Sequence, residues 1–124
     1  LTTGSRFDVM TRAEVDSVLP RVMGFNSLLR SARFPGLIVT ERNNGTVCVQ
    51  AHRAGASLSG GCAMVEVFLD GVRLFHPESV LSNLAPSIIE SMRFMDAVEA
   101  GVRYAGPRTG NGVLVIETRR GGQR

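Results

Sequence analysis

Lysine and tryptophan are absent from this 124-residue sequence, and it contains a single tyrosine. All 14 positively charged residues are arginines, scattered from Arg6 to Arg124 with one adjacent pair, Arg119 and Arg120. A protein that binds nucleic acid usually clusters its basic residues and places aromatic side chains among them for base stacking. The sequence therefore predicts a solvated surface rich in arginine and no nucleic-acid partner.

Long apolar runs are also absent. No segment approaches the ~18 consecutive apolar residues of a transmembrane helix, so we expect no membrane span in this chain. The stretch from Leu1 to Arg12 lacks the apolar core of a secretory signal peptide. The length and the 44% hydrophobic content are ordinary for one globular domain. We predict a single domain over residues 1–124, with a loose polar tail at about 119–124.

Several short helices are expected. Thr11 and Glu14 have the spacing of a capping box, with Met10 and Val15 at the hydrophobic staple positions, so a helix begins there and ends at Pro20. Further helices are predicted at about 26–32, 77–84 and 97–104. Pro86 is expected to start one more helical turn.

Short strands alternate with these helices. We predict strands at 37–40, 46–51, 63–69, 72–74, 92–95 and 113–118. Asn44-Gly45 and Asp70-Gly71 are suited to hairpin turns, because glycine readily supplies positive φ. Residues 54–61 and 106–112 read as loops. The resulting fold class is α+β, with a small mixed sheet and short helices.

Cys48 and Cys62 are the two cysteines of the chain. In an exported protein they would form a structural disulfide that closes a loop of about 15 residues, which is worth about 3 kcal/mol. Two free buried thiols are the second interpretation. A zinc site with His52 and His76 is the third, but the ligand spacing matches no usual paired motif. We therefore predict the disulfide, no metal and no cofactor.

The sequence contains no complete catalytic motif. The stretch Gly55-Ala-Ser57-Leu-Ser59 lacks the final glycine of a nucleophile elbow and precedes no helix. The glycines of 106–112 lead into a strand, whereas a phosphate cradle needs the N-terminus of a helix. No catalytic residue is predicted, and we expect a protein that is not an enzyme, with a small hydrolase or metal enzyme as the least favoured reading.

Among the acidic residues, Asp70 is expected in a turn, and Glu90 and Glu99 at exposed helix positions. Glu66 interrupts an apolar strand. We expect it on the solvent face of that strand, with pairing to a buried arginine as the alternative.

One run of motifs extends over nearly the whole chain. Its central part, Val67-Phe-Leu-Asp-Gly-Val-Arg-Leu74, resembles a signature of the plug domains of TonB-dependent outer-membrane receptors. Leu84-Ala-Pro-Ser-Ile-Ile-Glu90, Ala100 to Gly106 and Asn111-Gly112-Val-Leu-Val-Ile-Glu-Thr118 resemble the later motifs, in the family's order. Upstream, Met10 to Val15, Leu28-Leu29-Arg30 and Pro35-Gly36-Leu-Ile-Val39 resemble the earlier ones. The positions that match the family's motifs are Pro35, Gly36, Asp70, Gly71, Pro86, Ile89, Glu90, Ala100, Tyr104, Gly106, Asn111, Gly112 and Thr118.

This resemblance implies a domain that lies inside a β-barrel and occludes and gates it until an energy-coupling partner acts. It also implies a location on the periplasmic side of a Gram-negative cell envelope, associated with the outer membrane. The implied partner is a β-barrel of the same or another chain, or other subunits of a membrane complex. No ligand-binding residue can be transferred to this sequence.

The sequence also departs from the family's pattern. Arg93 occupies an acidic position of the family, and no segment for the energy-coupling protein is recognisable before the domain. The predicted disulfide resembles a feature of plug-like proteins that have no barrel. The alternative function is therefore a barrel-less periplasmic subunit that acts as a structural or interaction component of a larger membrane complex.

Overall fold

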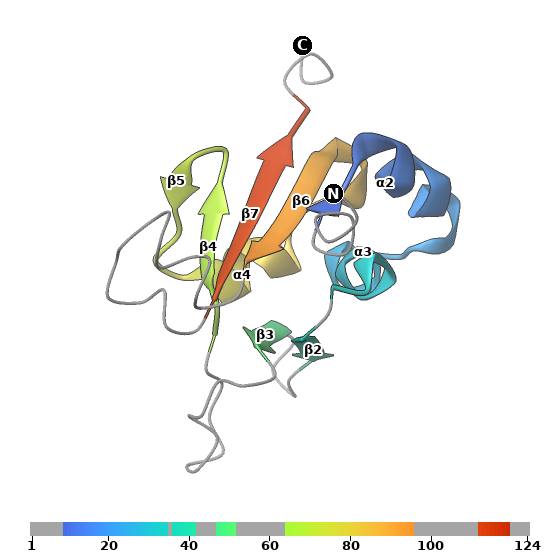
Figure 1. Ribbon diagram of the computed structural model, residues 1–124. Coiled ribbons are helices and arrows are strands. Elements are labelled where there is room, and N and C mark those ends of the chain that lie inside the picture. The colour runs from blue at the N-terminus through green and yellow to red at the C-terminus, as the bar shows by residue number, and fades with distance from the viewer. Residues whose placement is uncertain (1–8, 35, 42–46, 52–63, 96–111, 120–124) are drawn as a thin grey trace, which may run out of the picture.

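A mixed five-stranded sheet forms the centre of the protein (Figure 1). The computed structural model describes residues 9–34, 36–41, 47–51, 64–95 and 112–119. Across the sheet the strand order is β1-β6-β7-β4-β5. The bounds are β1 Val9–Met10, β4 Glu66–Leu69, β5 Val72–Arg73, β6 Ile89–Met95 and β7 Val113–Thr118.

One pairing in this sheet is parallel and three are antiparallel. β4 runs parallel to β7, whereas β1 with β6, β6 with β7 and β4 with β5 are antiparallel. The parallel pairing joins segments that are more than 40 residues apart in the sequence. Together with the short helices, this sheet confirms the predicted α+β fold class.

Local sequence explains where several of the short helices begin. The helices are α2 Arg12–Val18, η1 Leu19–Arg21, α3 Phe25–Ala32, α4 Pro77–Ser82 and η3 Pro86–Ile88. The predicted capping box of α2 is confirmed: the Thr11 N–H donates to Glu14 Oε1 at 2.8 Å, and the Glu14 N–H donates to Thr11 Oγ1 at 3.3 Å. Proline begins both α4 and η3, where its missing N–H has no intrahelical partner to lose.

A separate two-stranded sheet consists of β2 Leu37–Glu41 and β3 Val47–Ala51. The two strands are antiparallel from Leu37↔Ala51 to Glu41↔Val47, as the sequence predicted. The Val65 N–H, just before β4, donates to the Val49 carbonyl at 2.9 Å. In Figure 1 this hairpin lies below the sheet, opposite the end at which β7 stops.

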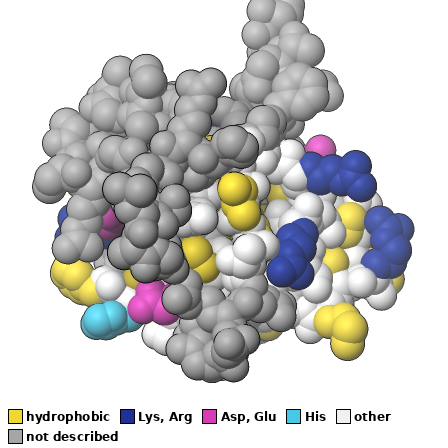
Figure 2. Space-filling view, turned by 90° about the horizontal axis from the view of Figure 1, so that it is seen from below, with side chains coloured by type: hydrophobic (Ala, Val, Ile, Leu, Met, Phe, Trp, Pro, Cys, Tyr) yellow, Lys and Arg dark blue, Asp and Glu magenta, His cyan; other side chains and the backbone are white. Residues whose placement is uncertain are grey.

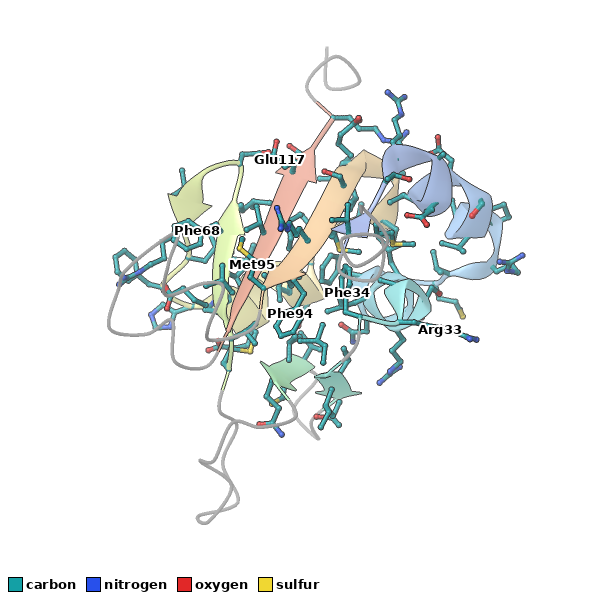
Figure 3. The ribbon with its side chains drawn as sticks, viewed as in Figure 1. Arg33, Phe34, Phe68, Phe94, Met95 and Glu117 are labelled. Carbon is teal, nitrogen blue, oxygen red and sulfur yellow. The ribbon has the colours of Figure 1, made fainter. Side chains whose placement is uncertain are left out.

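The main hydrophobic core lies between one face of the five-stranded sheet and the helices with the hairpin. Val15, Leu28 and Leu81 come from the three α-helices, and they are fully buried in the same cluster as Leu114 and Ile116 of β7. The Phe34 and Phe94 rings contribute at 6.4 Å between centroids (Figure 3). Because side chains alternate along a strand, the neighbouring residues of β7 point to the other face.

That other face carries a smaller apolar cluster. Met95 and Val113 are buried there, and Phe68 and Val115 pack against them. Glu66, on the same face of β4 as Phe68, is only 7% exposed. The prediction that Glu66 faces solvent is therefore wrong. Glu66 pairs with an arginine, as in the alternative, but this arginine, Arg73, is partly exposed and not buried.

The second difference from the sequence-based expectations concerns Glu90. It was expected in a helix, but the helical turn that starts at Pro86 ends at Ile88, and Glu90 belongs to β6. This strand therefore begins three residues before the predicted Met92. β1 was not predicted, because a strand of two residues has no readable alternation. The predicted turn at Asn44-Gly45, the loop at 54–61, the helix at 97–104 and nearly all of the loop at 106–112 lie outside the described residues.

Candidate functional site

The Asp70-Gly71 turn links two of the sequence motifs. Asp70 has φ +52° and Gly71 φ +86°, the backbone of a tight hairpin turn between β4 and β5. The Asp70 carboxylate accepts the Thr118 N–H at 2.8 Å and the Thr118 hydroxyl at 2.5 Å. The Asp70 N–H donates to the Ile116 carbonyl at 2.9 Å. The aspartate thus fastens the turn to the end of β7, 48 residues away.

Arg119 continues this arrangement past the end of β7. Its N–H donates to the Ile88 carbonyl at 2.8 Å, and its Nε donates to the Ile89 carbonyl at 3.0 Å. One guanidinium nitrogen also pairs with Asp16 of α2. Arg119, at the approximate start of the tail expected at about 119–124, is held by three elements. Residues 120–124 lie outside the described part.

A line of alternating charges crosses the same end of the sheet. Glu90 Oε1 lies 3.6 Å from an Arg12 nitrogen, and Arg12 Nε lies 3.8 Å from Asp16 Oδ2. Asp16 then pairs with Arg119, so that the order is Glu90, Arg12, Asp16, Arg119. These four side chains form what we call the charge chain. Three of them are 40–56% exposed. Because solvent screens exposed charges, each exposed pair contributes little to the free energy of unfolding.

A second charged pair is much more enclosed. Glu66 Oε2 accepts from Arg73 Nε at 2.8 Å, with side chains that are 6% and 38% exposed, respectively. The Arg73 guanidinium carbon lies 5.4 Å from the centre of the Phe75 ring. This ring is 75% exposed, and Val72 of the edge strand β5 is 63% exposed. Sequence reasoning gave an arginine partner for Glu66 only as an alternative and did not name Arg73. The hairpin register contains the signal, since Phe68 opposes Arg73 and Glu66 shares the same strand face.

The remaining described motif positions have structural roles. Gly36 follows the end of α3 at φ +80°, Pro86 begins η3, and Ile89 is fully buried at the start of β6. Gly112 has φ +90°, and a Cβ there would lie 3.1 Å from the Met95 carbonyl oxygen. The motif positions Pro35, Ala100, Tyr104, Gly106 and Asn111 lie outside the described residues.

Cys48 lies on β3 at 3% exposure and is disulfide-bonded. Its predicted partner Cys62 lies outside the described residues, so the pairing of these two positions stays a prediction.

Within residues 9–95 and 112–119, apart from the gaps given above, no group of three or more His, Cys, Asp or Glu side chains could hold a metal ion. His76 is exposed just before α4, and His52 lies outside the described part. The described motif positions lie at turns, at strand ends and beside the charge chain, where they fix the fold. That the protein is not an enzyme stays a prediction.

Comparison with known proteins adds one similarity of fold. No family model and no curated protein matches the sequence. Among solved structures, the fold resembles part of a chain of the RagAB peptide importer in its "closed-closed" state, with a TM-score of 0.61 and 19% identity. The match covers 90% of this chain and 12% of the importer chain. In the part of the sequence that the structure describes, no helix has the length and apolar character needed to span a membrane.

Proposed function

We propose that this chain is a plug-like module that occludes and gates a TonB-dependent outer-membrane transporter. The observation that carries the proposal is the fold similarity to part of a peptide importer chain over 90% of the sequence. The run of sequence motifs that resemble plug domains supports it independently. The module performs no chemical step; it closes a pore until an energy-coupling partner acts on it.

Within this proposal the described motif residues hold the module together. Asp70 and Thr118 join two motifs that are far apart in the sequence, and Arg119 binds the start of β6 to α2. The partner is the wall of a β-barrel, contributed by the same or another chain. The location is the outer membrane of a Gram-negative bacterium, with the module reached from the periplasmic side.

Deletion of the module from the natural protein tests this function. Removal of residues 9–119 from the full gene should leave an open pore, and the cells should become sensitive to vancomycin, a large antibiotic that an intact outer membrane excludes. Cells that produce the full-length protein at the same level in the outer membrane are the control. Unchanged sensitivity, with the shortened protein still present in the outer membrane, would contradict occlusion.

The disulfide at Cys48 favours a second candidate, a barrel-less periplasmic module that acts as a structural or interaction subunit of a membrane complex. The intact mass of the protein from its own membranes separates the two candidates. A mass far above the 13.3 kDa of this sequence, with a heat-modifiable band on an electrophoresis gel, would favour the transporter. A mass only somewhat larger would favour the barrel-less subunit. Alkylation of both cysteines only after reduction is expected in either case.

A further inference from the structure

Four exposed side chains, three of them arginines, lie on η1, α3 and the connections beside them. We call Arg21, Met23, Arg30 and Arg33 the arginine surface. All four residues are exposed, and Met23 reaches 95%. Residues 17–40 contain no aspartate or glutamate. Figure 2 shows arginine side chains gathered on the side of the molecule formed by α2, η1 and α3, with hydrophobic side chains between them.

Two of these arginines lack the partners that the arginines of the charge chain have. Within the described residues, neither Arg21 nor Arg33 forms an ion pair, whereas Arg12 and Arg119 each pair with a carboxylate. Like charges without carboxylate partners, here Arg21 and Arg33, create a positive potential over the surface that carries them. This potential attracts an anionic partner and steers its approach.

The backbone at Arg33 is a second and independent observation. Arg33 caps the end of α3 with φ +53° and ψ +44°, in the left-handed region. Glycine and asparagine are the residues that favour this position at the end of a helix. A cation near the end of a helix also interacts favourably with the helix dipole, but Arg30 already supplies one in the last turn. Strained backbone positions are found mainly at functional sites, so an unfavourable residue at this exposed cap points to a role in binding.

The chemistry of the surface favours a protein partner over a lipid one. The apolar side chains of α3, Phe25, Leu28 and Leu29, are buried in the core and cannot insert into a membrane. Met23 is the one large apolar side chain of the arginine surface, which is little for a membrane anchor. Arginine and methionine are both enriched at the centres of protein interfaces. Arginine also binds carboxylates through paired hydrogen bonds.

We propose that the arginine surface binds an acidic surface of a separate polypeptide. Met23 fills a small apolar pocket of the partner, and Arg21 and Arg33 pair with aspartate and glutamate side chains around it. Occlusion of a pore does not require this contact, so the proposal goes beyond the function proposed above.

Photo-crosslinking in the natural cells, with the full-length protein, tests this proposal. Benzoylphenylalanine at position 23 should give a product with one other polypeptide, at a segment that contains aspartate or glutamate. The same probe at Val72, which is exposed on β5, is the matched control and should not give that product. The double substitution Arg21→Glu and Arg33→Glu should lower the yield about tenfold, and reversal of the partner's acidic residues to arginine should restore it.

A single substitution separates binding from folding. Arg33→Asn suits the left-handed backbone, so the urea midpoint should stay the same or rise while the crosslink yield falls. Four results would overturn the proposal: a product with lipid, a product within the same chain or with the chain that forms the barrel, a partner segment without acidic residues, or a yield that charge reversal leaves unchanged. Vancomycin exclusion should be normal in all these variants, which keeps this test distinct from that of pore occlusion.

Discussion

The charged side chains at the end of the sheet and those around α3 are arranged in opposite ways. At the sheet end, Arg12 and Arg119 pair with Asp16 and Glu90, and the Asp70 carboxylate is occupied by Thr118. Around α3, the exposed Arg21 forms no ion pair with any described residue. Charges that bind each other stabilise the fold, whereas charges without a local partner can bind another molecule.

This comparison makes a testable distinction. Substitutions at contacts between strands of the five-stranded sheet should lower the free energy of unfolding. Substitutions on the arginine surface should leave it nearly unchanged. The four predictions below run from the largest expected effect on stability to the smallest, and each uses urea unfolding of the 124-residue chain with its disulfide intact.

The largest loss is expected for Gly112→Ala at the start of β7. The new Cβ would meet the Met95 carbonyl oxygen and the Phe94 ring at 3.1 Å, and φ there is +90°. Backbone strain and the close contact together should cost about 3 kcal/mol. Gly36→Ala is the matched control, because φ is +80° with no heavy atom within 4 Å, and it should cost about 1 kcal/mol. Equal losses for the two variants would show that the close contact is unimportant.

Much of the local structure could be predicted from the sequence, because its causes are local. The capping box at Thr11, the Asp70-Gly71 hairpin, the turn at Pro86 and the strand at 113–118 all depend on residues close together in the chain. The parallel pairing of β4 with β7 has no such local signal. Its partners are brought together only by the burial of apolar faces across a long stretch of sequence.

The errors at Glu66 and Glu90 have the same origin. A glutamate in an apolar strand is expected at the solvent face unless the position of its cation is known, and Arg73 reaches Glu66 only through the register of the hairpin. Glu90 follows a proline and two isoleucines that suit a helical turn and a strand equally well. Glu90 belongs to a strand because β6 pairs with β7, which lies far along the sequence. The charge chain was not predicted either, although the i,i+4 spacing of Arg12 and Asp16 was visible.

The second largest loss is expected for Arg73→Ala. It would leave the Glu66 carboxylate, 6% exposed, without its cation. Removal of one partner of a buried pair is costly, and the partial exposure of Arg73 reduces the expected loss to about 2 kcal/mol. The double variant Glu66→Leu with Arg73→Leu should recover most of the stability, since it leaves no buried charge. A double variant that is less stable than Arg73→Ala would contradict this account.

A moderate loss is expected for Asp70→Ala at the turn. The substitution removes the acceptor of the Thr118 N–H and hydroxyl and places alanine at φ +52°. The expected cost is about 1–2 kcal/mol. Asp70→Asn keeps the residue type that tolerates this backbone and one acceptor oxygen, so it should lose about half as much. If the two variants were equally stable, the contact between the turn and β7 would contribute nothing.

The smallest effect is expected for Arg33→Asn on the arginine surface. Asparagine tolerates φ +53° better than arginine does, and Arg33 forms no ion pair with a described residue that could be lost. The free energy of unfolding should change by less than about 0.5 kcal/mol, or rise. Arg30→Asn within α3 is the comparison: it replaces a good helix former and removes an interaction that Arg33 lacks among the described residues, so it should cost more than Arg33→Asn, roughly 0.5 kcal/mol or above. If Arg33→Asn instead cost as much as Asp70→Ala, then Arg33 would be a structural residue, and the distinction between the two regions would fail at the position where it is sharpest.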